Sequence, residues 1–235
     1  MNPHSLLYLI KRLIKIAYMN TSNKKQPVSG RPRGRPSDMK SGELQSRVLD
    51  IAEELFAEQG YAATSVRELA ARAGVNPALV HYYFGSKRKL LIAVMDRALL
   101  PLAEGISAIK TSGSGRVRDL ADLLFNMAAE HPAMPRLITR EVMLSSGETK
   151  ELFAKNYAPR LGGALPELFK KEQGEGRVRQ NFDAGAATLI LLSLCFFPFI
   201  ARSIAEPILG IDYTEKGRQA YLDQINELLS EGLTS

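Results

Sequence analysis

Apolar residues recur along this chain mostly at the spacing of amphipathic helices. The clearest case is residues 43–59, whose apolar side chains fall three or four residues apart and therefore share one helical face. These positions are Val48, Ile51, Ala52, Leu55 and Phe56. Beyond residue 90 the same spacing continues, without the alternation and hairpin turns of strands. The pattern predicts an all-α fold in which the first helix packs on those that follow.

Two short helices are predicted directly after this first one, and capping residues mark their ends. Ser65 starts the earlier helix, and Glu68 three residues later completes the arrangement of a capping box. Gly74 ends it, because glycine accepts the left-handed backbone that follows many helices. Asn76 then caps a helix over residues 77–84, whose proline at the first position loses no hydrogen bond.

The composition of residues 77–84 suits DNA contact. A helix of two turns is too short to build a core, but the DNA major groove admits one α-helix. Its first residues are small enough for close approach to base edges, and the next can donate hydrogen bonds to phosphates. Lys87 adds its charge at the N-terminus of the next helix, which Ser86 caps. Taken alone, the Tyr-Tyr-Phe run is more typical of a core.

The order of caps, glycine turn, proline, aromatic residues and lysine along this segment resembles the N-terminal pattern of the TetR family of bacterial repressors. The matching positions are Ala52, Leu55, Phe56, Gly60, Tyr61, Thr64, Leu69, Ala70, Ala73, Gly74, Val75, Tyr83, Phe84, Ser86, Lys87 and Leu90. The resemblance implies a three-helix helix-turn-helix domain that binds DNA. One departure is His81, where the family usually has tyrosine. Histidine there could alter a thymine contact or make binding weakly pH-sensitive.

The resemblance also implies which residues contact DNA. They are Ser65, Arg67, Pro77, Ala78, His81, Tyr82, Tyr83 and Lys87. Ser65 and Lys87 match phosphate contacts, whereas Arg67 matches a position that reaches a base in some members. A bidentate arginine–guanine pair contributes about 1–3 kcal/mol of discrimination. The alternative for Arg67 is an ion pair with the adjacent Glu68 or a solvated charge.

Charge separates the N-terminus from the rest of the chain. Residues 1–40 carry nine Lys and Arg against one Asp, so the formal net charge of +6 comes from this segment. Residues 30–36 resemble an AT-hook, in which Arg33 and Arg35 would enter a narrow A·T minor groove. The alternative is a solubilising leader that touches phosphates loosely.

Residues 1–18 are interpreted as an upstream in-frame extension, with an amphipathic membrane-surface helix as the alternative.

The rest of the chain predicts a helical domain broken at glycines and prolines. The expected helices are residues 86–108, 117–130, a helix after the turn at residues 131–135 that runs through Met143, 149–171 with Pro159 as a candidate kink, 182–205 and 214–232. In the last of these, Tyr221, Ile225, Leu228 and Leu229 are expected to turn inward. Residues 189–201 are apolar all round and too short to span a bilayer. We expect them to be buried both in their own domain and against a second subunit. The resemblance implies a homodimer that binds a palindromic operator; burial within a monomer is the alternative.

Family members bind small effectors between the helices of this domain, so the resemblance implies an effector pocket. The candidate residues are Phe125, Met134, Arg140, Met143, Phe153, Phe196 and Phe199, with Glu141 as a further polar group. A stripe of Met and Phe at helical spacing is more often part of a plain core, which is the alternative.

Catalytic chemistry finds little support in the sequence. The histidines His4, His81 and His131 are scattered, and no His, Cys or carboxylate spacing indicates a metal. Cys195 lies in the most apolar segment and is interpreted as a buried hydrophobic residue. We therefore expect no enzyme, no metal and no cofactor. The unpaired cysteine and the lack of targeting signals predict a cytoplasmic protein.

Together the patterns predict three parts: a basic extension (1–40), a helix-turn-helix domain (41–88) and a helical domain for effector binding and dimerisation (89–235). The predicted function is a sequence-specific transcriptional regulator that binds double-stranded DNA, a repressor released by a small hydrophobic effector. The alternatives are an architectural binder of A·T-rich DNA, dominated by the basic arm, and a membrane-attached regulator using residues 6–18.

Overall fold

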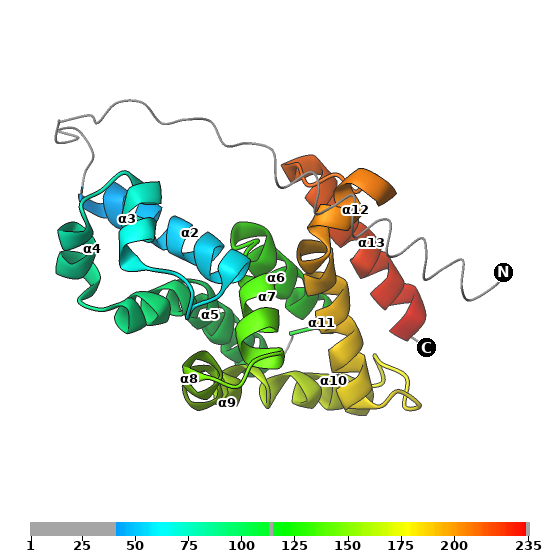
Figure 1. Cartoon of the computed structure of the whole chain (residues 1–235). Helices are drawn as coiled ribbons and strands as arrows, with labels where there is room; N and C mark the ends of the chain where they lie inside the picture. Colours follow the sequence, from blue (N-terminus) through cyan, green and yellow to red (C-terminus); the bar gives the residue numbers. More distant parts are fainter. Residues whose placement is uncertain (1–40, 113–114, 234–235) are drawn as a thin grey trace, which may run out of the picture. The chain divides into compact units, whose positions relative to one another are not determined.

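Helices make up the regular structure of residues 41–112 and 115–233, the part of the chain that the computed structural model describes (Figure 1). The predicted all-α class is confirmed. The elements are α2 (Ser41–Gln59), α3 (Val66–Ala73), α4 (Pro77–Phe84), α5 (Lys87–Thr111), α6 (Val117–Glu130), α7 (Met134–Ile138), the π-helical turn η1 (Thr139–Met143), α8 (Glu148–Asn156), α9 (Ala158–Leu161), α10 (Ala164–Gly174), α11 (Ala184–Ile200), α12 (Arg202–Leu209) and α13 (Glu215–Leu233). Arg33, Arg35 and the rest of the basic extension lie outside the described residues.

The helices α2, α3 and α4 form the predicted helix-turn-helix unit (Figure 1). The Ser65 hydroxyl accepts a hydrogen bond from the Glu68 amide at 3.1 Å, and Gly74 ends α3 with a φ of +69°. The capping box is only half formed, because the Glu68 carboxylate accepts from Gln59 Nε2 at 2.9 Å. Asn76 caps α4, as predicted.

The long helix α5 belongs to both parts of the described chain. It packs against α2 on one side and against α6 and α10 further along. Ser86 caps its start by accepting from the Lys89 amide at 3.2 Å. The domain boundary predicted at residues 88/89 therefore falls inside the first turn of a shared helix, and the division into an upstream and a downstream domain stays a prediction.

A buried carboxylate joins α2 to the helices around it. Glu53 is 3% exposed, and its Oε2 accepts from Arg97 Nη2 of α5 at 2.9 Å. The ring nitrogen Nδ1 of His131, the residue that ends α6, lies 3.1 Å from the same oxygen. Arg97 also binds Asp50 at 2.6 Å. Since a buried charge is tolerated only when it is paired, this cluster fixes how α2 sits on α5 and α6.

Three predicted helical features are wrong in detail. The helix expected over residues 149–171 is three helices, α8, α9 and α10, interrupted at Tyr157 and at Gly162–Gly163. Tyr157 leaves the helical path to bury its ring, and its hydroxyl donates to Asp96 Oδ1 at 2.7 Å. The two glycines then favour a break, because glycine is a poor helix former.

The helix expected over residues 182–205 ends at Ile200, and α12 continues after a bend of 78°. The Pro198 carbonyl, which would accept the next helical hydrogen bond, instead accepts from the Tyr213 hydroxyl at 2.5 Å. No single described helix is long and apolar enough to cross a membrane. Among the described helices, only the bent pair α11 and α12, taken together, reaches that length and apolar composition.

In α13 the inward face differs by one position from the prediction. Ile225 is buried, and Tyr221 and Leu229 pack on the core, as expected. Leu228 is 60% exposed, whereas Leu222 is buried. The 3.6-residue period places Leu222, Ile225 and Leu229 on one face and turns Leu228 away from it.

Candidate functional site

The described residues predicted to contact DNA lie on or beside α3 and α4, which pack together (Figure 1). Arg67 and Ser65 are exposed at the start of α3. On α4, Ala78 and His81 are exposed, Pro77 and Tyr83 are partly buried, and Tyr82 is 81% exposed. Val80 turns inward and holds the helix to the core. A short helix thus presents its polar and small side chains outward from a packed support.

The His81 ring contacts the backbone that ends α4. Its Nδ1 lies 3.2 Å from the Gly85 carbonyl, so Nδ1 acts as a donor when it carries the hydrogen. Tyr82 and Tyr83 pack edge-to-face, with ring centroids 5.2 Å apart. These contacts stiffen the helix end and leave the Nε2 edge of the His81 ring for other partners.

Lys87 is held against the loop between α2 and α3. Its ammonium donates to the Ala62 carbonyl at 3.2 Å and lies 4.4 Å from the centroid of the Tyr61 ring, a cation–π contact. Burial lowers the pKa of Lys87, while the charges of Glu141 and Glu148 oppose that shift. The two local contacts place its charge near the capped start of α5, where the helix dipole also favours an anion.

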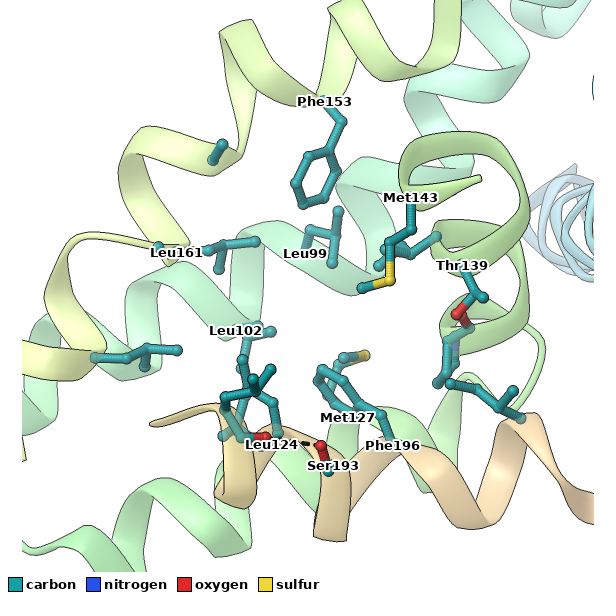
Figure 2. Close-up of a pocket in the computed structure, with 18 of the residues that line it drawn as sticks. Leu99, Leu102, Leu124, Met127, Thr139, Met143, Phe153, Leu161, Ser193 and Phe196 are labelled. Atoms are coloured by element: carbon teal, nitrogen blue, oxygen red, sulfur yellow. Dashed lines mark hydrogen bonds between the residues drawn. The ribbon is translucent and has the colours of Figure 1, made fainter. Parts of the chain in front are cut away.

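A cavity of about 390 Å³ lies among the helices downstream of α4 (Figure 2). Its walls come from α5 to α11 and include Leu102, Phe153, Leu161 and Phe196, whose side chains converge on a common space. None of the described residues that line it is charged. The walls therefore suit a largely hydrocarbon ligand.

The two hydroxyls on the cavity wall are already bound to their own helices. Thr139 Oγ1 donates to the Pro135 carbonyl at 2.8 Å, and Ser193 Oγ donates to the Leu189 carbonyl at 2.8 Å. Each oxygen keeps acceptor capacity but has used its only hydrogen. The cavity can therefore accept a hydrogen bond from a ligand at these two points, but cannot donate one from them.

Three of the seven predicted pocket residues line this cavity: Met143, Phe153 and Phe196. Phe125 and Phe199 instead pack on each other, with centroids 5.4 Å apart, and Phe125 stacks on Tyr221. Met134 is fully buried in the core. The aliphatic wall, such as Leu102 and Leu161, was missed because nothing in the sequence distinguishes a cavity leucine from a core leucine.

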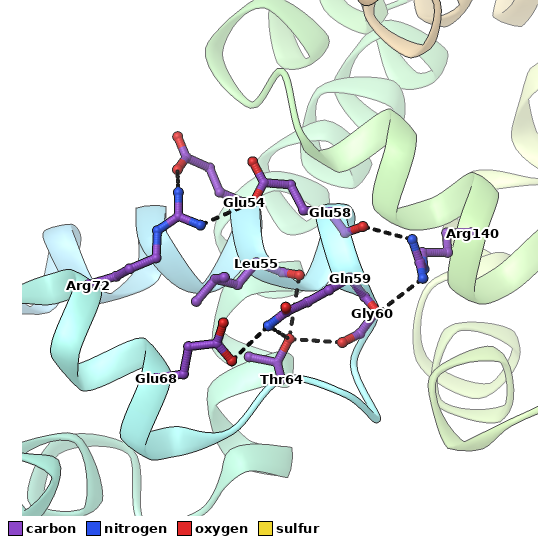
Figure 3. A network of polar contacts seen from close by, with 9 residues as sticks. All are labelled: Glu54, Leu55, Glu58, Gln59, Gly60, Thr64, Glu68, Arg72 and Arg140. Carbon is purple, nitrogen blue, oxygen red and sulfur yellow. Dashed lines mark hydrogen bonds and ion pairs between the residues drawn. The ribbon is translucent and has the colours of Figure 1, made fainter. Parts of the chain in front are cut away.

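Arg140 and Glu141 are not among the residues that line the cavity, and Arg140 points toward the end of α2 (Figure 3). The Arg140 guanidinium donates to the carbonyls of Glu58 at 2.8 Å and Gln59 at 3.0 Å. Glu141 accepts from the Tyr61 amide at 3.2 Å. The prediction that these two residues supply polar groups to the pocket is therefore wrong, since both are occupied by backbone groups of the helix-turn-helix unit.

The apolar helix α11 is buried on one side only. Leu191, Cys195 and Phe199 are buried in the chain, whereas Leu189 is 66%, Ile190 53% and Phe197 62% exposed. Leu189 and Phe197 also line the cavity, so part of this exposed side borders it. Large apolar side chains exposed together mark a surface for another protein or the edge of a ligand groove. The predicted burial of this segment is confirmed for the side that faces its own domain.

Reactive groups are scarce around these sites. Cys195 is buried, as predicted, and burial raises the pKa of its thiol to about 12. Over the described residues, no group of three His, Cys, Asp or Glu is placed to hold a metal ion.

Two family models match the chain. Residues 48–94 match the N-terminal model described as bacterial regulatory proteins, tetR family, and residues 114–229 match a tetracyclin repressor-like C-terminal domain. The HTH-type transcriptional repressor NicS of Pseudomonas putida is 23% identical over 79% of this chain and 90% of its own length. The HTH-type transcriptional regulator BetI of Brucella canis is 32% identical over 61% of this chain and 74% of its own.

The fold agrees with solved structures. The ketosteroid transcriptional regulator KstR2 of Mycobacterium tuberculosis superposes with a TM-score of 0.66 at 18% identity, over 89% of this chain and all of that one. Nothing in these matches supports the alternative of an architectural DNA binder. The chain belongs to the TetR family and is a DNA-binding transcriptional regulator.

Proposed function

We propose that the protein is a homodimeric repressor that binds a palindromic operator and leaves it when an uncharged hydrophobic effector fills the cavity. The observation that carries the effector half is the cavity of about 390 Å³, whose described lining has no charged residue. As a regulator of bacterial genes it acts in the cytoplasm, where the DNA lies.

The proposed DNA contacts come from α3, α4 and the start of α5. Arg67 reads a base, and Pro77, Ala78 and His81 lie along the base edges. Tyr82, Tyr83, Ser65 and Lys87 hold the phosphates. Their support is that α4 is a two-turn helix of the right size for a major groove. Five of the eight side chains are exposed on or beside α3 and α4: Ser65, Arg67, Ala78, His81 and Tyr82. Arg33 and Arg35 add minor-groove contacts from the basic arm.

The proposed dimer uses the exposed side of α11. Covering Leu189, Ile190 and Phe197 with the same helix of a second copy removes their apolar surface from water. A two-fold dimer then presents two α4 helices to half-sites one DNA turn, about 34–36 Å, apart.

The effector class follows from the hydroxyls on the cavity wall. Thr139 and Ser193 can accept but not donate, so a neutral ligand with a hydroxyl or amide hydrogen gains one or two hydrogen bonds. A carboxylate would enter without a cationic partner on the described lining, and burying an unpaired charge is costly.

Addition of the neutral hydrophobic dye Nile red should release the protein from its bound DNA. We expect its fluorescence to rise on binding and the affinity for DNA to fall about tenfold, within the usual range of coupling between two sites. Fluorescence titration and a gel-shift assay measure the two effects. An anionic fatty acid serves as the comparison and should bind more weakly. Dye that binds in the cavity without changing DNA affinity would contradict the proposed regulation.

A further inference from the structure

The π-helical turn η1 touches the cavity and the helix-turn-helix unit at once. Thr139 and Met143, its first and last residues, line the cavity. Arg140 and Glu141, between them, bind the end of α2. The turn is closed by a hydrogen bond from the Leu144 amide to the Thr139 carbonyl at 3.0 Å. Such turns are rare in proteins and occur frequently at functional sites.

Arg140 caps α2 from outside that helix. The last carbonyls of a helix have no partner within it, and here those of Glu58 and Gln59 accept from the two terminal nitrogens of Arg140 (Figure 3). The planar guanidinium satisfies both carbonyls together, and its positive charge suits the negative end of the helix dipole. A shift of η1 therefore acts directly on the end of α2.

Glu141 makes the second contact, and Gly60 allows it. Gly60 has a φ of +94°, and a Cβ there would lie 2.9 Å from Glu141 Oε1 and 3.0 Å from Arg140 Nε. Only glycine fits this backbone and this close approach without strain. The Glu141 carboxylate then accepts from the Tyr61 amide at 3.2 Å.

From α2 the contacts continue to α3. The Gln59 side chain donates from Nε2 to Glu68 Oε2 at 2.9 Å and to Thr64 Oγ1 at 3.3 Å (Figure 3). Thr64 in turn donates to the Gly60 carbonyl at 2.8 Å and is buried. Gln59 thus has its carbonyl bound to η1 and its side chain bound to α3.

We propose that Arg140 and Glu141 form a clamp through which filling of the cavity changes the position of α3. A ligand that displaces Thr139 or Met143 moves η1, and the clamp transfers that movement to α2, Gln59 and α3. The proposal rests on the proposed function, because it takes the cavity as the effector site. Arg140 and Glu141 are positioning residues, since neither is among the proposed DNA contacts or the residues that line the cavity.

The helix α5 offers a separate route from cavity to reader. Leu99, Leu102 and Ile106 of α5 line the cavity, and the same helix starts directly after α4. The clamp and α5 can be separated by substitution because Arg140 is half-exposed and, among the described residues, its polar contacts are with the end of α2 and the adjacent Glu141.

The test compares wild-type protein with Arg140→Ala and Arg140→Lys as full chains. Each is titrated with Nile red and with a genomic DNA fragment selected by the wild type, with and without saturating dye. We expect Arg140→Ala to bind the dye within about twofold of wild type, while the dye-induced loss of DNA affinity falls from about tenfold to below about threefold. Arg140→Lys should restore part of the loss, because one ammonium can reach one of the two carbonyls.

Arg136→Ala is the matched control, since Arg136 is an exposed arginine of the neighbouring α7. It should leave the dye effect unchanged. In the wild type, dye should also speed deuterium exchange at the Tyr61 amide, the donor to Glu141. Full coupling in Arg140→Ala would overturn the clamp and leave α5 as the route, with the proposed function intact. Dye binding to wild type without any change in DNA affinity would overturn both.

Discussion

Replacement of Ile190 by glutamate is expected to convert the protein to a monomer and to lower its operator affinity by about 10²–10⁴-fold, the range by which a second linked reader raises affinity. Ile190 is 53% exposed on α11 and does not line the cavity. In the proposed dimer, a glutamate at position 190 faces the apolar side of the second copy's α11, a helix that carries no charged residue. Burying this unpaired carboxylate is costly, so the substitution destabilises the interface by more than the loss of the Ile190 contact. Sedimentation equilibrium measures the association and a gel shift measures DNA binding.

Ala108→Glu provides the control for this experiment. Ala108 is exposed in the last turn of α5 and does not line the cavity, so the substitution adds the same charge at an apolar surface position on another helix. We expect it to leave both association and DNA affinity unchanged. An Ile190→Glu protein that remains a dimer would place the interface elsewhere on the chain.

Replacement of Glu53 by alanine should lower the free energy of unfolding by about 3 kcal/mol, the lower end of the range for breaking a buried ion pair. The substitution leaves Arg97 without its buried partner and His131 without its acceptor. The lower end applies because Arg97 keeps its contact with Asp50 and is partly exposed. Urea unfolding at a fixed protomer concentration measures the change, since dimer stability depends on concentration.

The adjacent Glu54 supplies the comparison. Its side chain is 54% exposed and pairs with Arg72 at 3.6 Å, so Glu54→Ala should cost at most about 1 kcal/mol. Equal losses for the two substitutions would mean that the buried cluster contributes no more than a surface ion pair.

The helix-turn-helix unit could be predicted closely because its boundaries depend on local chemistry. Ser65, Asn76 and Ser86 each cap a helix, and Gly74 supplies a left-handed residue. These effects act within a few residues and are therefore readable in sequence. The partner of Glu68 was not, because Gln59 reaches it only once α2 and α3 are packed.

Longer-range features escaped prediction for the same reason. The break at Tyr157 depends on Asp96, about 60 residues earlier, and the end of α11 depends on Tyr213. Arg140 was predicted to be a polar group of the effector pocket, but the π-turn directs it to α2. Hydrophobic spacing cannot separate a cavity wall from a filled core, because both need apolar side chains on one helical face.

The central claim is that α3 and α4 select a specific operator. Selection of bound genomic fragments with purified full-length protein, at about 150 mM salt to suppress nonspecific phosphate binding, tests it most directly. We predict recovery of a few palindromic sites with half-sites about one DNA turn apart. Recovery of broadly A·T-rich DNA without a palindrome would contradict the claim, because the basic arm of residues 1–40 would then govern binding.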